Sequence, residues 1–266
     1  MPTPATITIP PAPQPAPVEA VQTDLRARLS ALYGHAQQSA YVFGSPLGPF
    51  FHHAAAFHVP RFAYFGPNTT DASVRLAVLS GYSSQSLPGT LALIAFIQRL
   101  ALNPEIGHSL NLSFFPIVDV LGTLGDEAGR ALGNESWTAS SAPELALLEK
   151  DARLRAYQGF IRIETNDDDV ITAELRAGHS LYAEAPDIEL IASDDFGPWP
   201  VRFQGAAAHA SRGPLALSED LPFAPFELTV AVPRAWPQPF IDRAVAHLLK
   251  RFIVRYRGLQ AYGQHL

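Results

Sequence analysis

The feature that most constrains the fold is one stretch of the chain, residues 74–100, in which the pattern of a strand is followed, after a short loop, by that of a helix. The first part places Val74, Leu76 and Val78 on one face and has Arg75 as its only strongly polar residue, which is typical of a buried strand. The second part has helical spacing and almost no polar face. Its apolar positions are Leu91, Ile94, Ala95, Ile97 and Leu100.

A buried strand that feeds a buried helix predicts the core of an α/β sheet. Between the two elements, residues 80–88 must form a loop at the carboxyl end of the strand. Open α/β sheets bind their ligands at such strand ends. We therefore expect a functional site of this chain to include that loop.

Composition limits the size of the core and the kind of partner. The chain has 266 residues, of which 47% are hydrophobic, and this is enough for one large domain with a well-buried core. A formal net charge of −6 argues against nucleic acid or an anionic membrane as a partner. The absence of cysteine excludes disulfides, thiolate metal sites and thiol nucleophiles. No apolar run reaches the roughly 18 residues that a membrane span needs.

The N-terminal segment differs from the rest of the chain. Residues 1–17 include seven prolines and neither lysine nor arginine, so they lack the pattern of a secretory signal and are expected to form an extended Pro/Ala arm. A cytoplasmic protein is the simpler expectation. Residues 18–266 are expected to form a single domain, which begins with an amphipathic helix that ends near Gly34.

Later segments extend the α/β pattern. A closing helix is expected from about residue 237 to residue 257, and Ser141 and Glu144 have the spacing of a capping box before another helix. Further strands are expected at residues 110–118, 160–166 and 226–232. This order predicts a mixed, mostly parallel twisted sheet with helices on both faces. Residues 177–225 have few periodic runs and are expected to form loops and short strands.

Two groups of residues have the chemistry of metal ligands. His52, His53 and His58 have no carboxylate at ligand spacing beside them, and adjacent residues of an extended segment point to opposite faces. Residues 167–169 are consecutive aspartates without the alternating spacing of a calcium loop. We interpret the histidines as surface or core residues and the aspartates as a solvated turn.

A series of landmarks runs in order from the strand-end loop to the closing helix. They are Gly81, Pro116, Gly122, Leu132, Trp137, Pro143, Glu144, Phe226, Glu227, Pro233, Tyr256, Arg257, Ala261 and Tyr262. Their order and spacing over roughly residues 59–266 resemble the zinc carboxypeptidase family, especially its bacterial branch related to succinylglutamate desuccinylase and aspartoacylase. The resemblance implies a carboxypeptidase-like fold, a catalytic zinc ion and a hydrolytic activity.

The resemblance also locates the family's chemical residues, and this chain has other side chains there. The first histidine and the glutamate of the zinc site fall on Tyr82 and Gln85, and the third ligand falls on Glu164. A neutral phenol and an amide are poor substitutes for imidazole and carboxylate. The general-base glutamate falls on Ala231, which cannot accept a proton. The family's Asp and its Asn-Arg pair, which grips a substrate carboxylate, fall on Ala131, Gly133 and Asn134.

These differences predict a carboxypeptidase-like protein that has lost its zinc and its hydrolytic activity. The sequence His-x-x-Glu occurs nowhere in the chain, so a shift of register does not restore the zinc motif. The cleft is expected to persist and to bind a small polar ligand or a peptide. Its predicted lining is Tyr82, Gln85, Asn134, Glu164 and Ala231.

Two other functions stay open. The chain could be an active hydrolase of the carboxypeptidase or deacylase type with His179 or His209 as the base, although no Gly-x-Ser-x-Gly sequence is present. The serines available to it in the strand-end loop are Ser80, Ser83, Ser84 and Ser86. It could instead be a structural partner of an active relative, bound through the Pro-rich arm or an apolar patch. No pattern identifies a ligand, a partner protein or an oligomeric state.

Overall fold

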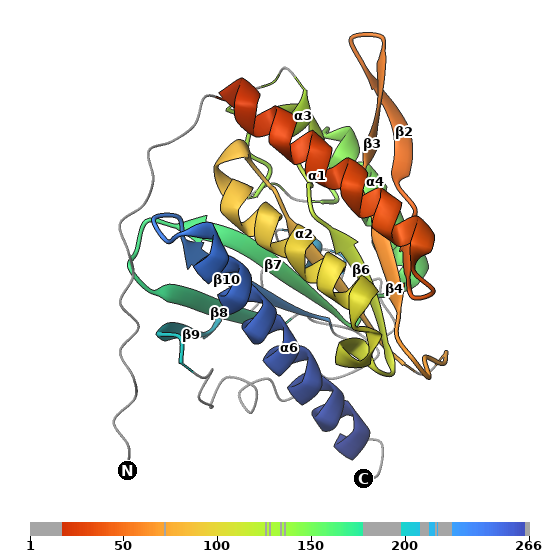
Figure 1. Ribbon diagram of the computed structural model, residues 1–266, viewed down its shortest axis with the longest axis vertical. Coiled ribbons are helices and arrows are strands. Elements are labelled where there is room, and N and C mark those ends of the chain that lie inside the picture. The colour runs from red at the N-terminus through yellow and green to blue at the C-terminus, as the bar shows by residue number, and fades with distance from the viewer. Residues whose placement is uncertain are drawn as a thin grey trace.

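The fold is organised around a mixed β-sheet (Figure 1). The structure, a computed structural model, describes residues 18–71, 73–125, 127, 129–133, 135, 137–177, 198–207, 213–215, 217 and 225–263. Within these residues the strands of the sheet are β1 (Val42–Gly44), β4 (Phe62–Phe65), β5 (Val74–Ser80), β6 (Leu110–Phe115), β7 (Gly159–Asn166), β8 (Ile171–Ala177), β9 (Val201–Ala207) and β10 (Phe226–Pro233). They lie side by side in the order β1-β4-β6-β5-β7-β10-β8-β9.

Parallel pairing dominates the centre of the sheet. Strands β6, β5, β7 and β10 are parallel neighbours, so their carboxyl ends meet at one edge. Strand β4 pairs antiparallel with both β1 and β6, and β8 pairs antiparallel with β10 and parallel with β9. The mixed, mostly parallel sheet predicted from the sequence is confirmed.

Helices cover both faces of this sheet (Figure 1). Helices α1 (Val18–Gln38), α2 (Leu87–Leu102) and α6 (Gln238–Gly263) lie on one face, where α2 packs between the other two. Helix α4 (Pro143–Arg155) lies on the opposite face, and the rings of Trp137 and Tyr157 from its flanking loops meet the ring of Phe160 edge to face. Shorter turns are α3 (Val120–Leu124), η1 (Ser84–Ser86) and η2 (Pro104–Gly107).

The strand and helix expected over residues 74–100 are β5 and α2. Strand β5 is buried along most of its length and pairs with β6 on one side and β7 on the other. Helix α2 begins at Leu87 with Pro88 in its first turn, where the missing N–H of proline removes no helical hydrogen bond. Because β5 is a central strand, the loop between them opens onto the middle of the sheet's carboxyl edge.

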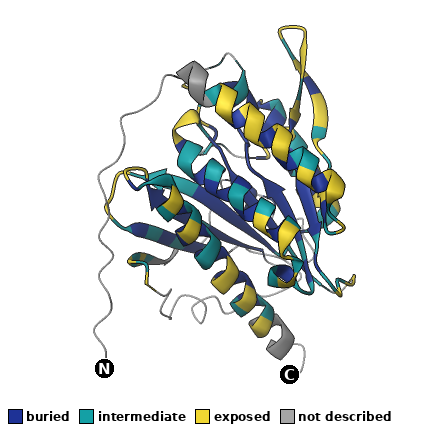
Figure 2. Cartoon of the chain, viewed as in Figure 1, coloured by how far each residue is buried: buried dark blue, intermediate teal, exposed yellow. Residues whose placement is uncertain are grey.

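Burial follows this layered arrangement. Figure 2 shows buried residues in the central strands and exposed residues on the outer sides of α1 and α6. The largest fully buried side chains are aromatic and aliphatic, and they are spread along the chain from Leu25 to Tyr256. None of the described helices is long and apolar enough to cross a membrane.

Several element boundaries differ from the sequence-based expectation. Helix α1 does not end near Gly34 but continues to Gln38, because Ala36, which is 5% exposed, extends its apolar face into the core. Helix α6 continues past residue 257 to Gly263. Strand β6 ends at Phe115, because the N–H of Val118 donates to the carbonyls of Ser80, at the end of β5, and of Gly81. Strand β8 was not expected at all. Its buried side chains are Ile171, Ala173 and Leu175.

The capping box expected at the start of α4 is wrong. The N-cap residue is Ala142, and no side chain caps the helix there. The Glu144 carboxylate instead accepts hydrogen bonds from the Leu121 N–H, at 3.2 Å, and from Arg130, at 3.0 Å. The Glu144 carboxylate is therefore paired with Arg130, outside the helix, and does not cap the helix end as the local pattern predicts.

The histidines of the N-terminal region lie on a separate hairpin, formed by β2 (Leu47–His52) and β3 (Ala55–Val59). His53 and His58 are exposed, and His52 is half-buried with Nε2 3.4 Å from Glu127 Oε1. The turn of residues 167–169 is also exposed, and Asp167 pairs with Arg234 at 2.8 Å. Residues 1–17, the expected Pro-rich arm, lie outside the described residues.

A buried ion pair ties α4 to the strand layer beneath it. Arg61, just before β4, pairs with Asp151 of α4, and the two side chains are 9% and 5% exposed. The Tyr157 hydroxyl donates a hydrogen bond to the second carboxylate oxygen of Asp151 at 2.7 Å. The carboxylate thus satisfies a buried cation and a buried phenol at the same time.

Removing this carboxylate should therefore destabilise the fold. We expect Asp151→Ala to lower the free energy of unfolding in a urea titration by about 3–5 kcal/mol, because Arg61 is left buried without its counter-charge. The control is Glu149→Ala on the same helix, which removes a partly exposed pair with Arg153 and should cost less than about 1 kcal/mol. Equal losses in the two variants would contradict this account of the pair.

Candidate functional site

The candidate site lies where the loop after β5 meets the carboxyl ends of β7 and β10. Gly81 begins this loop with φ of +67°, and a Cβ atom on it would lie 2.8 Å from the Pro116 carbonyl oxygen. The Gly81 carbonyl accepts the N–H of Asp119 at 2.8 Å. Only glycine fits this left-handed backbone between two chain segments, and it turns the next residue, Tyr82, toward the sheet.

Backbone contacts join Tyr82 and its neighbour in the loop after β5 to residues 131–132 of the loop before α4. The Tyr82 carbonyl accepts the N–H of Leu132 at 2.8 Å, and Ser83 forms an isolated bridge with Ala131. Its side chain is 3% exposed, and its hydroxyl has no hydrogen-bond partner among the described residues. Burial raises the pKa of the Tyr82 hydroxyl, so the group is a neutral phenol.

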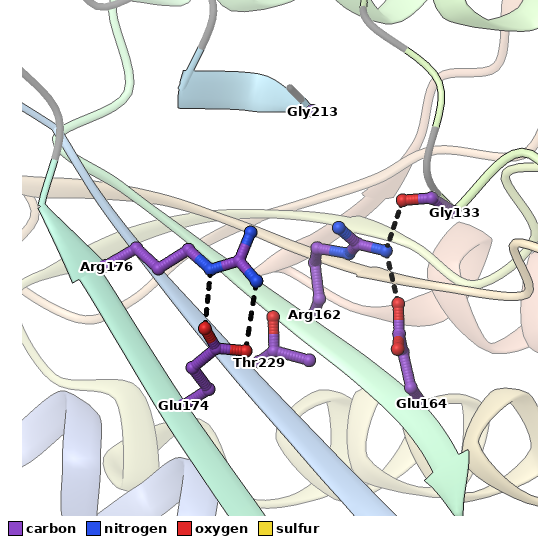
Figure 3. A pocket seen from close by; sticks show the side chains of 7 residues that line it. All are labelled: Gly133, Arg162, Glu164, Glu174, Arg176, Gly213 and Thr229. Carbon is purple, nitrogen blue, oxygen red and sulfur yellow. Dashed lines mark hydrogen bonds and ion pairs between the residues drawn. The ribbon is translucent and has the colours of Figure 1, made fainter. Parts of the chain in front are cut away.

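The Arg162 guanidinium is the centre of the polar contacts at this edge. It donates to the Gly133 carbonyl at 2.9 Å and to Glu164 (Figure 3). It also donates to Glu227 Oε1 at 3.1 Å. Its Cζ atom also lies 4.4 Å from the centroid of the Tyr82 ring, the geometry of a cation–π contact. Arg162 and Glu227 are 8% and 1% exposed, so this pair is almost entirely removed from solvent, whereas the Glu164 side chain is 31% exposed.

Strand register brings these side chains to one face. Residues two apart on a strand share a face, so Arg162 and Glu164 point the same way from β7. On β10, Thr229 pairs with Arg162 and Ala231 pairs with Glu164, which places Glu227 on that face as well.

Burial raises the pKa of Glu227, although the charge of Arg162 opposes this rise. Burial lowers the pKa of Arg162, but the surrounding groups outweigh it and the net direction is upward.

Two small clefts open over this network. One has a volume of about 230 Å³, and Figure 3 shows its lining side chains. These are Gly133, Arg162, Glu164, Glu174, Arg176, Gly213 and Thr229. The other has a volume of about 190 Å³ and is lined by Tyr82, Ser83, Gln85, Ser86, Ala131, Gly133, Glu164, Thr165 and Arg234. Gly133 and Glu164 belong to both, so the two clefts adjoin.

The structure brings three of the predicted lining residues together. Tyr82, Gln85 and Glu164 line the smaller cleft. Ala231 lies beside Glu164 in the sheet but lines neither of these two clefts. Asn134 lies outside the described residues. Whether these residues bind a ligand stays a prediction.

The alternative serine-based site is only partly visible. Ser80 is fully buried and its hydroxyl donates to the Ile163 carbonyl at 2.9 Å. Ser83 and Ser86 lie 3.3 Å apart through their hydroxyl oxygens, and both line the smaller cleft. The two candidate bases, His179 and His209, lie outside the described residues.

Sequence reasoning missed the charged residues that dominate the site: Arg162, Glu174, Arg176 and Arg234, with Glu227 noted only as a landmark. Arg176 makes a bidentate pair with Glu174 on the same strand, at 2.8 and 3.1 Å. The available signal was the alternation of charged and apolar residues in β7 and β8, because an acid and a base two apart on a strand share a face. This signal indicates a polar face and names no chemistry.

A second buried cluster supports the loop that carries Gly133. Asp119 is fully buried, accepts the Gly122 N–H at 3.0 Å, and burial raises its pKa to about 6. Arg130 lies 3.7 Å from Asp119 and pairs at 3.0 Å with Glu144. These contacts fix the chain immediately before Ala131, which lines the smaller cleft, and Gly133, which lines both.

Comparisons with known proteins identify the fold. No family model and no curated protein sequence matches the chain. A metallo-carboxypeptidase from Pseudomonas aeruginosa, solved in complex with (2-guanidinoethylmercapto)succinic acid, is similar with a TM-score of 0.65 and 15% identity over 88% of this chain and 69% of its own. One from Burkholderia cenocepacia has a TM-score of 0.64 and 15% identity over 86% and 68%. Carboxypeptidase A from Helicoverpa armigera has a TM-score of 0.58 and 14% identity over 90% and 73%. The carboxypeptidase-like fold implied by the sequence landmarks is confirmed.

The unpartnered hydroxyl of Tyr82 leads to a prediction about stability. Tyr82→Phe removes a buried polar group without a hydrogen bond, so the free energy of unfolding in urea should rise by about 1 kcal/mol. The matched control is Tyr157→Phe, which removes a buried hydroxyl that does donate a hydrogen bond and should lower that free energy by about 1–3 kcal/mol. Losses of similar size in both variants would show that the Tyr82 hydroxyl has a partner.

Proposed function

We propose that this protein is a catalytically inactive relative of the metallo-carboxypeptidases that binds a small polar molecule or a peptide in its strand-end clefts. The observation that carries the proposal is the ion pair between Arg162 and Glu164. Of the three positions that resemble zinc ligands, Glu164 has the only carboxylate, and that carboxylate is bound to a buried cation of the chain itself.

The zinc ion that the resemblance implies does not fit these side chains. A zinc site of high affinity requires deprotonated ligands and on the order of 10 kcal/mol of binding free energy. Tyr82 is a buried neutral phenol, Gln85 is a neutral amide, and Glu164 is already ion-paired. A divalent cation would also lie close to the positive guanidinium that contacts both Tyr82 and Glu164.

The chain also lacks a base where the resemblance places one. Ala231 ends in a methyl group, so it cannot take a proton from water, and the loss of a general base alone costs roughly 10²–10⁴ in rate. Glu227 lies on the same strand and face, but it is 1% exposed and paired with Arg162. Its role is to neutralise that cation.

The adjoining clefts support a binding function. Their lining is polar and carries both signs of charge, with Glu164 and Arg234 in the smaller cleft and Arg176 in the larger one. Backbone and hydroxyl groups between these charges add hydrogen-bonding positions for a ligand. Such a lining favours a molecule with both an ammonium and a carboxylate group, as in an amino acid derivative or a short peptide.

We expect no hydrolysis of C-terminal amino acid amides or N-acyl amino acids above a blank, with or without added zinc. Ala231→Glu should be equally inactive, because a base alone has no activated water to deprotonate. A metallo-carboxypeptidase of the same fold serves as the positive control for the assay. Zinc-dependent, chelator-sensitive turnover by the wild-type protein would show that the proposed inactivity is wrong.

The binding half of the proposal is tested with the same compounds as ligands in calorimetric titrations. Saturable binding of at least one compound class should weaken about tenfold in Glu164→Gln, since the charge at the wall shared by both clefts is lost. The control is Glu149→Gln, which lies on α4 and lines neither cleft. The same affinity in Glu164→Gln and in the control would place the ligand elsewhere.

A further inference from the structure

We propose that Arg162 is a built-in cation that replaces the metal ion of the carboxypeptidase-like site and holds the site together in its absence. The inference rests on the proposed loss of zinc and extends it, because it assigns a structural function to a residue that has no counterpart among the landmarks. It predicts that removal of Arg162 leaves the buried carboxylate of Glu227 and the partly exposed carboxylate of Glu164 able to accept a divalent cation.

The first support is position. Two of the three positions that resemble zinc ligands contact the Arg162 guanidinium directly: Glu164 through an ion pair, and Tyr82 through the face of its ring, 4.4 Å from Cζ. The third, Gln85, lines the same cleft as these two residues. The positive charge therefore lies beside the place where the resemblance puts the metal.

The second support is charge. Glu164 and Glu227 lie on the same face of β7 and β10, on either side of Arg162, since Glu164 pairs with Ala231 and Glu227 with Phe160; Glu227 is 1% exposed. The Glu227 carboxylate requires a cation, since a buried charge without a partner is strongly unfavourable. Arg162 pairs with both carboxylates, at 3.1 Å in the case of Glu227. Arginine stays protonated at all ordinary pH values, so this cation is permanent.

The third support is connectivity. A metal ion joins ligands from separate segments, and the five N–H groups of a guanidinium can do the same. Arg162 contacts the loop after β5 through Tyr82, the loop before α4 through the Gly133 carbonyl, and β10 through Glu227. The segment at Gly213 is also close, since a Cβ atom on Gly213 would lie 3.7 Å from Arg162 Nη1. The four segments are far apart in the sequence.

The buried ion pair of Arg162 and Glu227 is not itself fully satisfied. Glu227 Oε2 and Arg162 Nε are buried without a hydrogen-bond partner among the described residues. With the guanidinium removed, the carboxylates of Glu164 and Glu227 and the Gly133 carbonyl would present oxygen donors to one space. Oxygen donors of this kind suit hard divalent cations such as Ca²⁺.

The experiment compares the thermal unfolding of wild type, Arg162→Met, Arg162→Lys and Arg176→Met, each with and without 10 mM CaCl₂. Methionine keeps much of the length of the side chain and removes its charge. Arg176→Met is the matched control, because Arg176 lines the same cleft but pairs with Glu174 at a partly exposed position. Calcium binding is measured in parallel by titration calorimetry.

We expect Arg162→Met to unfold roughly 10 °C below wild type, and Arg176→Met to change by no more than about 3 °C. Calcium should raise the melting temperature of Arg162→Met by at least about 3 °C and leave wild type and Arg176→Met unchanged. Arg162→Lys should melt between Arg162→Met and wild type, because it keeps the charge and loses the fork of donors.

Two results would overturn the inference: a melting temperature of Arg162→Met equal to wild type, or a destabilised Arg162→Met that binds no more calcium than Arg176→Met. If Arg162→Met does not fold, Arg162→Lys is the deciding variant. Failure of Arg162→Lys to fold as well would overturn the inference, because a positive charge at this position would then not be enough to hold the site together. These outcomes leave the proposed inactivity intact. Zinc-dependent turnover by wild type would overturn that proposal whatever the Arg162 variants do.

Discussion

The burial of one guanidinium group is the constraint on which the carboxyl edge of the sheet depends. Arg162 is 8% exposed, and a buried charge is tolerated only where counter-charges and acceptors surround it. Glu164 on the same strand, Glu227 on β10 and the Gly133 carbonyl meet this requirement, and the ring of Tyr82 from the loop after β5 packs against the guanidinium. The positions of the two site loops are therefore tied to the position of this cation.

Strand geometry makes the arrangement possible. Alternate residues of β7 point to opposite faces, so Ile161 and Ile163 belong to the face covered by α2, and Arg162 and Glu164 belong to the face of the clefts. The parallel partner β10 alternates in the same register and supplies Glu227. One pair of central strands thus builds the apolar core on one side and a charged network on the other.

The sequence predicted the parts of the fold that depend on local pattern. The strand and helix over residues 74–100 are present as β5 and α2, and the landmark spacing indicated the fold that the structural comparisons confirm. Positions such as Gly81 are informative because a single local conformation requires glycine.

The rest of the site depends on contacts between distant residues. Ser141 and Glu144 have the local spacing of a cap, but the carboxylate is taken by Arg130, 14 residues away. Arg162 bonds to Gly133, 29 residues away, and to Glu227, 65 residues away. No periodicity in the sequence records such partners, so the charged network could not be predicted. The resemblance identified the positions at which the zinc ligands and the general base are replaced. Only the structure shows that Arg162 lies beside them.

The account depends most directly on the claim that the chain's own cation, and not a metal ion, occupies this edge of the sheet. Elemental analysis of wild-type protein, purified without added metal and then dialysed against zinc, tests it. The account predicts zinc far below one ion per chain, at the level of a Gln85→Ala variant treated in the same way. One tightly bound zinc ion per wild-type chain, lost in Gln85→Ala, would contradict it.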